Sequence, residues 1–188
     1  MSFKLINIEK NFYKSYEIIS KNIPSSIFAA LGFSFFKYLI SKKIIQVYLI
    51  VKKKKISALI SVINYENYFA MNRKIIIYLA LNPLKLFMNL IKILSAVTKN
   101  SKFKINKKYL HLLHLIIFKK DFLHVSLKEK DKIINNFYKK ILKKNKSNTL
   151  FLCFEKANSK AYRYYLRNKF KLFYKIGNLL YFKKKYKI

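Results

Sequence analysis

The chain has 188 residues, of which 53% are hydrophobic and 17% aromatic, and it carries a formal net charge of +34 at pH 7. This length suits one domain, and the apolar content is too high for a wholly disordered basic tail. A single cysteine, Cys153, excludes a disulfide framework and a four-thiolate zinc site. Gly32 and Gly177 are the only glycines, which excludes an intact dinucleotide-binding or Walker A phosphate loop.

The positive charge is almost entirely lysine, because only three of the 41 basic residues are arginines. Abundant Lys, Ile, Asn, Phe and Tyr without any Trp are typical of an AT-rich coding bias. Proteins that read phosphates or bases usually use arginine, whose guanidinium bonds bidentately. We therefore favour compositional drift over a dedicated nucleic-acid surface, although such a charge still attracts polyanions in a salt-dependent way.

Hydrophobic periodicity divides the N-terminal half into short strands and helices. A continuous apolar run at 26–40 indicates one largely buried helix. Two β-branched runs flank four consecutive lysines, a pattern typical of a hairpin with an exposed loop. Asn82-Pro83 predicts a further helix, with Asn as N-cap and Pro at the first helical position. In chain order, the predicted elements are a strand over Phe3–Asn7, helices over 9–22 and 26–40, strands over 44–51 and 56–63, and a helix over 83–97.

The C-terminal half alternates between buried strands and amphipathic helices, after a lysine-rich connector at 101–108. The run at 109–118 is apolar throughout and predicts a central strand that is buried on both faces. Ser126 and Glu129 form a capping box that starts a helix near Leu127. The remaining predicted elements are a strand over 149–154, a helix capped by Asn158 that ends at Asn168, and strands over 171–175 and 179–183 that turn at Gly177. We therefore predict one mixed α/β domain over 1–188.

No segment predicts targeting or membrane insertion. The first ten residues lack the apolar core of a signal peptide. Polar residues interrupt the most apolar stretch, 75–97, so that it falls short of a membrane span. We expect a cytoplasmic protein.

The sharpest local signal is the stretch 158–170, which reads N-S-K-A-Y-R-Y-Y-L-R-N-K-F after a buried strand. It resembles the C-terminal motif N-x-x-A-x-x-[FY]-Y-x-x-x-G-F of the GNAT superfamily of N-acetyltransferases, with Lys169 in place of the glycine. The matching residues are Asn158, Ala161, Tyr164, Tyr165 and Phe170. The run 23–40 looks like the L-G-x-x-F-L-x-x-Y segment of a bacterial subgroup, so the resemblance covers nearly the whole chain.

This resemblance implies a mixed, mostly antiparallel sheet flanked by helices, whose fourth and fifth strands splay apart. It also implies acetyl transfer from acetyl-CoA to a primary amine of a small-molecule or carrier-linked acceptor. For catalysis, it implies that the amine attacks the thioester directly and that Tyr165 protonates the departing thiolate. A phenol with a pKa of about 10 can donate that proton. Glu66, near the end of the third strand, and His114, on the fourth, are the candidates for a general base. Plain packing is the alternative for Tyr165 and His114.

The resemblance further implies where acetyl-CoA binds. The family holds the pyrophosphate on a loop of pattern [QR]-x-x-G-x-[GA] after the fourth strand, whereas 119–130 contains no glycine here. Backbone N–H groups at a helix N-terminus bind anions whatever their side chains, although a Ser126 cap competes for one amide and Glu129 adds negative charge. Counting from the strand places the loop at 122–127, and counting from the helix places it at 125–130. The residues implied for the cofactor are Ile116, Ile117 and Phe118 at the strand end, Val125, Ser126, Leu127, Lys128, Glu129 and Lys130 in the loop, and Asn158, which could instead be a simple N-cap.

Three other patterns are weaker. His111 and His114 are three apart on a strand, so we expect them on opposite faces, which argues against a metal site. Cys153 lies among apolar residues and is interpreted as core packing. Aromatic and basic residues interleave over 162–175, as in proteins that bind single-stranded nucleic acid, although at helical spacing we favour an amphipathic helix with a solvated basic face. The alternative function is therefore a non-catalytic basic protein of the same fold that binds RNA or a ribonucleoprotein, whereas our first expectation includes no specific nucleic-acid partner.

Overall fold

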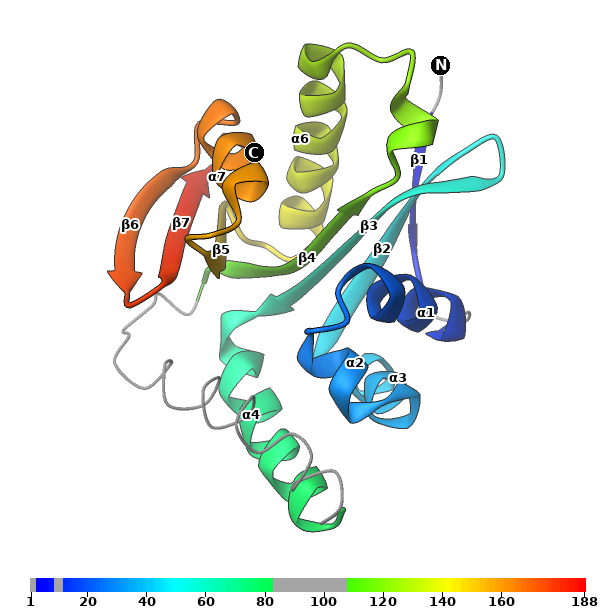
Figure 1. Cartoon of the computed structure of the whole chain (residues 1–188), viewed down its shortest axis with the longest axis vertical. Coiled ribbons are helices and arrows are strands. Elements are labelled where there is room, and N and C mark those ends of the chain that lie inside the picture. Colours follow the sequence, from blue (N-terminus) through cyan, green and yellow to red (C-terminus); the bar gives the residue numbers. More distant parts are fainter. Residues whose placement is uncertain (1–2, 9–11, 83–107) are drawn as a thin grey trace.

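The computed structural model describes residues 3–8, 12–82 and 108–188. Within these residues, seven strands form one sheet with the order β1-β2-β3-β4-β5-β7-β6 (Figure 1). Only β4 and β5 pair in parallel, so the prediction of a mixed, mostly antiparallel sheet is confirmed. The strands are β1 (Phe3–Asn7), β2 (Ile45–Lys52), β3 (Lys55–Asn64), β4 (Leu110–Ile117), β5 (Thr149–Glu155), β6 (Lys171–Ile176) and β7 (Leu179–Lys185).

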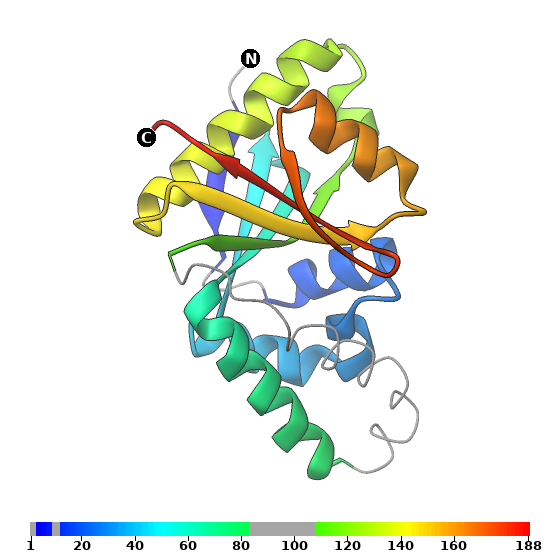
Figure 2. The ribbon, with the colours of Figure 1, turned by 90° about the vertical axis from the view of Figure 1, so that its left-hand side faces the viewer.

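Helices cover the sheet on both faces, and each layer encloses a core of its own (Figure 2). The first core lies between the sheet and the helices that precede β4, and the second lies between the sheet and the two helices that follow it. A short 3-10 turn, η1 (Lys119–Phe122), leads from β4 towards the second helical layer. The helices of the first layer are α1 (Phe12–Asn22), α2 (Ile27–Leu31), α3 (Phe33–Ser41) and α4 (Tyr65–Ala80), and those of the second are α6 (Leu127–Lys144) and α7 (Ser159–Arg167).

The predicted single helix over 26–40 is wrong, because the chain breaks it into α2 and α3 at Gly32. Gly32 has φ +89° and ψ 172°, a conformation that residues with a Cβ avoid. Its N–H donates to the carbonyl of Phe28 and closes α2, and its carbonyl accepts from Phe36 and opens α3. The unbroken apolar run hid this corner, since both short helices bury hydrophobic residues on either side of it.

The predicted hairpin is present as β2 and β3, but only two of its four lysines form the turn. Lys52 and Lys55 pair with each other as the last residues of the strands. Lys53 and Lys54 between them have φ +46° and +63°, the mirror-image turn that matches the twist of a two-residue hairpin. Such turns usually contain Gly or Asn, so two lysines here carry backbone strain.

Helix α4 was not among the predicted elements. Its buried residues Met71, Ile75 and Leu79 follow the spacing of one helical face, a signal that the apolar stretch starting at Ile75 obscured. The helix predicted over 83–97 lies outside the described residues, as does the connector at 101–107. Among the described residues, no helix combines the length and the apolar character needed to cross a bilayer.

Candidate active site

The two central strands β4 and β5 touch over a short distance and then diverge. Only 110–112 of β4 pairs with 150–152 of β5, although β4 continues to Ile117 and β5 to Glu155. A cleft of about 490 Å³ opens where they separate. The predicted splay of the fourth and fifth strands is therefore present. The cleft is lined by Ile23, Ser25, Ser26, Ile27, Phe28, Met71, Leu112, Leu113, His114, Leu115, Leu152, Cys153, Phe154, Glu155, Asn158, Ala161 and Tyr165.

A β-bulge on β4 lies at the start of this divergence. His114 pairs with Ser61 of β3 and Leu112 pairs with Val62, so Leu113 is one residue in excess. A bulge bends the strand that carries it and interrupts the alternation of side chains. Past Leu112, the edge of β4 that faces the cleft pairs with no strand among the described residues, which leaves backbone N–H and C=O groups available to a ligand.

The bulge also overturns the expectation that His111 and His114 point to opposite faces. Residues directly opposite in an antiparallel pair share a face. His111 is opposite Ile63 and His114 is opposite Ser61, and alternation along β3 puts both of those on the face of the first core. The two imidazoles therefore lie on the same side of the sheet. Among the described residues, no three His, Cys, Asp or Glu side chains gather closely enough to hold a metal ion.

His114 is held rigidly in the cleft wall as a neutral ring. Its Nδ1 lies 2.7 Å from the hydroxyl oxygen of Ser61, and its ring meets the ring of Phe28 edge-on with centroids 5.3 Å apart. Burial lowers the pKa of His114 to about 4, because the positive form loses its hydration. A ring that resists protonation accepts a proton poorly, which weakens the prediction of His114 as the general base.

Glu66 lies apart from this arrangement. It is an exposed residue in the first turn of α4, and it is not among the residues that line the cleft. The structure thus brings His114 and Tyr165 into one cleft and leaves Glu66 outside it.

Tyr165 faces the cleft from α7, in the layer opposite Phe28. Its side chain is only 8% exposed, and its ring stacks on Phe154 at 5.5 Å and meets Phe170 edge-on at 5.1 Å. Burial raises the pKa of Tyr165 well above its usual value, and the neighbouring Tyr164 adds to this effect. Tyr165 is therefore protonated at physiological pH, and it is a weaker acid than an exposed phenol.

Asn158 and Cys153 also belong to the cleft wall. The side-chain oxygen of Asn158 accepts from the N–H of Ala161 at 3.0 Å, so the predicted N-cap of α7 is confirmed. Cys153, interpreted above as core packing, is half-buried and lines the cleft instead.

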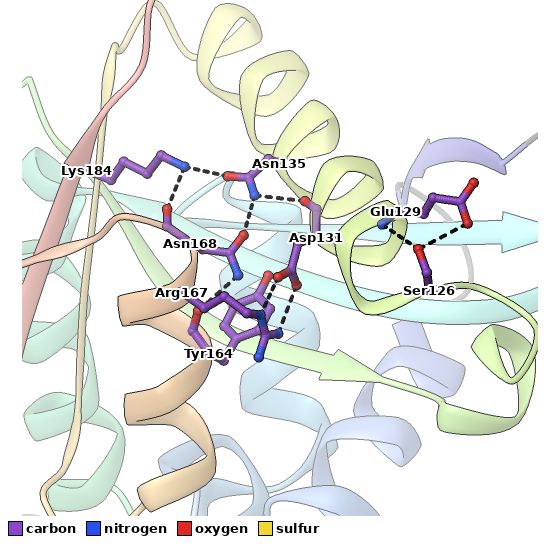
Figure 3. Close-up of polar contacts among 8 residues, drawn as sticks. All are labelled: Ser126, Glu129, Asp131, Asn135, Tyr164, Arg167, Asn168 and Lys184. Carbon is purple, nitrogen blue, oxygen red and sulfur yellow. Dashed lines mark hydrogen bonds and ion pairs between the residues drawn. The ribbon is translucent and has the colours of Figure 1, made fainter.

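A polar network that the sequence did not reveal fixes α7 against α6 and β7 (Figure 3). The Nε of Arg167 donates to Asp131 at 2.5 Å, and the second guanidinium donor reaches the same carboxylate at 3.1 Å. Asn135 donates to Asn168 at 2.5 Å and accepts from the ammonium of Lys184 at 2.7 Å. These contacts join residues that are far apart in the sequence, so no local sequence pattern predicts them.

This network engages only part of the aromatic and basic run over 162–175. Tyr164 packs against the second core, and Arg167 pairs with Asp131 while its side chain stays 44% exposed. Tyr162, Arg163 and Lys169 are exposed, so the run presents a solvated basic face.

The loop implied for the pyrophosphate leads through η1 to the N-terminus of α6. The Ser126 hydroxyl accepts from the N–H of Glu129 at 3.2 Å, which confirms the predicted cap, and donates to the Glu129 carboxylate at 3.4 Å. The first-turn amides of Leu127 and Lys128 have no acceptor within the helix. Lys130 lies over the ring of Phe122 at 5.4 Å, and burial lowers its pKa.

The residues implied at the strand end lie beyond the part of the cleft described above. Ile116 and Phe118 pack into the first core, and Ile117 packs against the second. Neither these three nor 125–130 are among the lining residues, which end at Leu115 on β4.

No protein-family model matches the sequence, and no curated protein matches it. Solved structures share the fold. The N-acetyltransferase PseH of Campylobacter jejuni, in complex with acetyl coenzyme A, is 18% identical with a TM-score of 0.57, covering 98% of this chain and 99% of that one. NAA60 of Arabidopsis thaliana, in complex with acetyl-CoA, is 11% identical with a TM-score of 0.56 and 98% coverage of both chains. The aminoglycoside acetyltransferase AAC(6')-Ib, in complex with coenzyme A and kanamycin, is 8% identical with a TM-score of 0.61, covering 98% of this chain and 95% of that one.

Proposed function

Because the chain has the fold of the GNAT N-acetyltransferases, we propose that it transfers an acetyl group from acetyl-CoA to a primary amine. The observation that carries the proposal is the cleft between β4 and β5, which is lined by the buried Tyr165 beside a strand edge that pairs with no described strand. The solved structures with this fold include complexes with acetyl-CoA and with coenzyme A. A likeness of fold does not name the acceptor, so the amine is assigned here only by its chemistry.

The residues of the cleft fit acetyl-CoA as the cofactor. The free backbone edge of β4 past Leu112 would pair with the amides of the pantetheine arm, and Asn158 lies on the opposite side of the cleft. The pyrophosphate would lie at the N-terminus of α6, where the amides of Leu127 and Lys128 are open. The Ser126 hydroxyl already occupies the amide of Glu129, so this site offers fewer donors than an uncapped helix.

Acetyl transfer requires that the amine and the thioester be held close together and that one group donate a proton to the departing sulfur. When bound, acetyl-CoA supplies a thioester whose carbonyl carbon accepts the lone pair of the amine. An acceptor that arrives as an ammonium first loses a proton to water, which frees its lone pair. The carbon–sulfur bond breaks, the Tyr165 hydroxyl gives its proton to the departing sulfur, and the second proton that the nitrogen loses passes through water and restores the phenol. The rings of Phe154 and Phe170 hold the phenol in place. Burial raises the pKa of Tyr165 and makes it a weaker acid, so the proton transfer depends on the negative charge that develops on the adjacent sulfur.

Calorimetry with acetyl-CoA tests the proposal directly. We expect saturable binding below about 1 mM, which is the usual range for a substrate of this class. Release of free thiol in the presence of a panel of primary amines then tests the transfer. An absence of binding at low millimolar acetyl-CoA contradicts the proposal.

A further inference from the structure

The cleft differs in charge from the rest of the molecule. About a fifth of the chain is Lys or Arg, yet none of the 17 described residues that line the cleft is Lys or Arg. Among these described residues, Glu155 alone has a formal charge, because His114 is neutral at physiological pH. The negative charge of this cleft is opposite in sign to the net charge of the chain, so the average composition does not account for it.

Glu155 lies at the mouth of the cleft on the side of the first helical layer. Successive residues of a strand point to opposite faces, and Leu152 and Phe154 pack on the second core. Cys153 and Glu155 therefore face the other way, as do His114 and Phe28. Tyr165 approaches from the second layer. An acceptor that entered beside Glu155 would thus approach the thioester from the side opposite the proton donor.

The backbone of Glu155 is fixed, and its exposed carboxylate has no ion-pair partner among the described residues. Its backbone is fixed by register with Leu179 and by a hydrogen bond of 2.9 Å from the N–H of Asn158 to its carbonyl. Within the described part of the chain, no cation forms an ion pair with its exposed side chain. Lys156 is the next residue but does not line the cleft.

We propose that the acceptor enters this cleft as a cation and that Glu155 binds its ammonium group, so that the acceptors are amines without an anionic group beside the nitrogen. That the bound amine is then acetylated rests on the proposed function. The preference of the cleft for a cation does not depend on it. The many lysines elsewhere do not prevent it, because salt at physiological strength screens charges beyond about 8 Å. A carboxylate in contact with the amine acts well within that distance.

Cys153 provides a probe of this charge, since it is the only cysteine and lies two residues from Glu155 on the same face. Two methanethiosulfonate reagents of similar size differ in charge: the trimethylammonium-ethyl reagent is a cation and the sulfonatoethyl reagent is an anion. In each, the thiolate attacks the reagent's sulfur, forms a mixed disulfide and displaces methanesulfinate. The ratio of the two labelling rates, divided by the same ratio for 2-mercaptoethanol, reports the potential in the cleft.

We expect this normalised ratio to exceed one in the wild-type chain, against the sign of its net charge. A unit charge about 6 Å away changes each rate by about threefold in water, in opposite directions, so Glu155→Gln should lower the ratio by about tenfold. Glu155→Lys should lower it further. Glu66→Gln is the matched control, because it removes the same charge from an exposed residue outside the cleft, and it should leave the ratio unchanged.

Three results would overturn the proposal: a wild-type ratio below one, an unchanged ratio in Glu155→Gln, or a Cys153 that neither reagent labels in the folded chain. Binding of benzylamine and of phenylacetate gives a second measurement, and we expect the wild-type chain to prefer the cation and Glu155→Gln to lose that preference. Protection of Cys153 by acetyl-CoA tests the proposed function separately. A ratio that depends on Glu155 without such protection supports the charge preference and contradicts acetyl transfer.

Discussion

Two concave surfaces of this molecule carry opposite charge characters. Among the described residues, Glu155 is the one charged residue that lines the cleft between β4 and β5, whereas a hollow of about 470 Å³ beside α1 and the β2–β3 turn is lined by five lysines together with Glu17 and Asp121. In the hollow, Glu17 is already engaged by Lys14 at 3.0 Å and Lys21 at 2.8 Å. The hollow therefore follows the average composition of the chain, and the cleft departs from it. In a chain whose composition is biased towards lysine, a surface that lacks lysine is therefore a better candidate for a functional site than one that is rich in it.

The largest expected effect lies in the cleft. Tyr165→Phe removes the proposed proton donor while keeping the ring that packs on Phe154. We expect kcat for acetyl transfer to fall by about 10²–10⁴-fold with acetyl-CoA binding retained, measured by thiol release and calorimetry. Tyr162→Phe removes a hydroxyl from a more exposed ring of the same helix and should leave kcat unchanged. An equal loss in both variants would assign the effect to helix packing.

The second effect is a pH dependence of stability that originates in the cleft wall. Burial lowers the pKa of His114 to about 4, from an ordinary value of about 6.5 in the unfolded chain. Between these values the unfolded chain binds a proton that the folded chain refuses, so the free energy of unfolding falls as pH falls from about 6.5 towards 4. The contribution is on the order of 3 kcal/mol. Urea unfolding across this range should show a shallower dependence in His114→Gln, and an equal slope in both proteins would contradict the assignment.

A third comparison sets the network under α7 against the ion pairs beside the hollow. Asp131→Ala leaves Arg167 and the end of α7 without their anchor, and we expect a loss of about 1–3 kcal/mol in the free energy of unfolding. Glu17→Ala removes a carboxylate that also has two basic partners, but both are exposed, so the loss should stay below about 1 kcal/mol. Similar losses in the two variants would show that the network adds no more than surface pairs do.

The smallest effect belongs to the turn that borders the hollow. Lys54 has φ +63°, where glycine carries no steric penalty, so Lys54→Gly should raise the free energy of unfolding by about 0.5–1 kcal/mol. Lys55→Gly places the same change in β3 and should lower it by a similar amount. Thermal unfolding of the two variants distinguishes them by the opposite signs of their shifts.

Local signals predicted those parts of the fold that depend on a few neighbouring residues. The caps at Ser126 and Asn158 and the start of α6 follow from side chains that bond to amides within one turn. Tyr165 was identified from a short motif and does face the cleft. The net charge of the chain was less informative about the site, since the excess of lysine does not predict a cleft whose described lining contains none.

The features that escaped prediction depend on residues distant in sequence. The bulge at Leu113 is defined by the register with β3, and alternation alone gave the wrong face for one of the two histidines. The network around Asn135 joins α6, α7 and β7. The importance of Glu155 depends on the sixteen other described residues that line the same cleft. Gly32 was visible in the sequence, but its apolar neighbours continued the helical pattern past the corner.

The excess residue on β4 has a consequence for the evolution of this strand. Leu113 and His114 share one side of the sheet, and Leu115 returns to the other, so removing Leu113 would leave every later side chain on its present side. Such a deletion would restore regular pairing and straighten the strand, since bulges are what bend it. A chain that lacks this one residue could therefore keep both hydrophobic layers and lose the cleft between β4 and β5. The loss of a single codon would then preserve the fold and remove the cleft on which the proposed reaction depends.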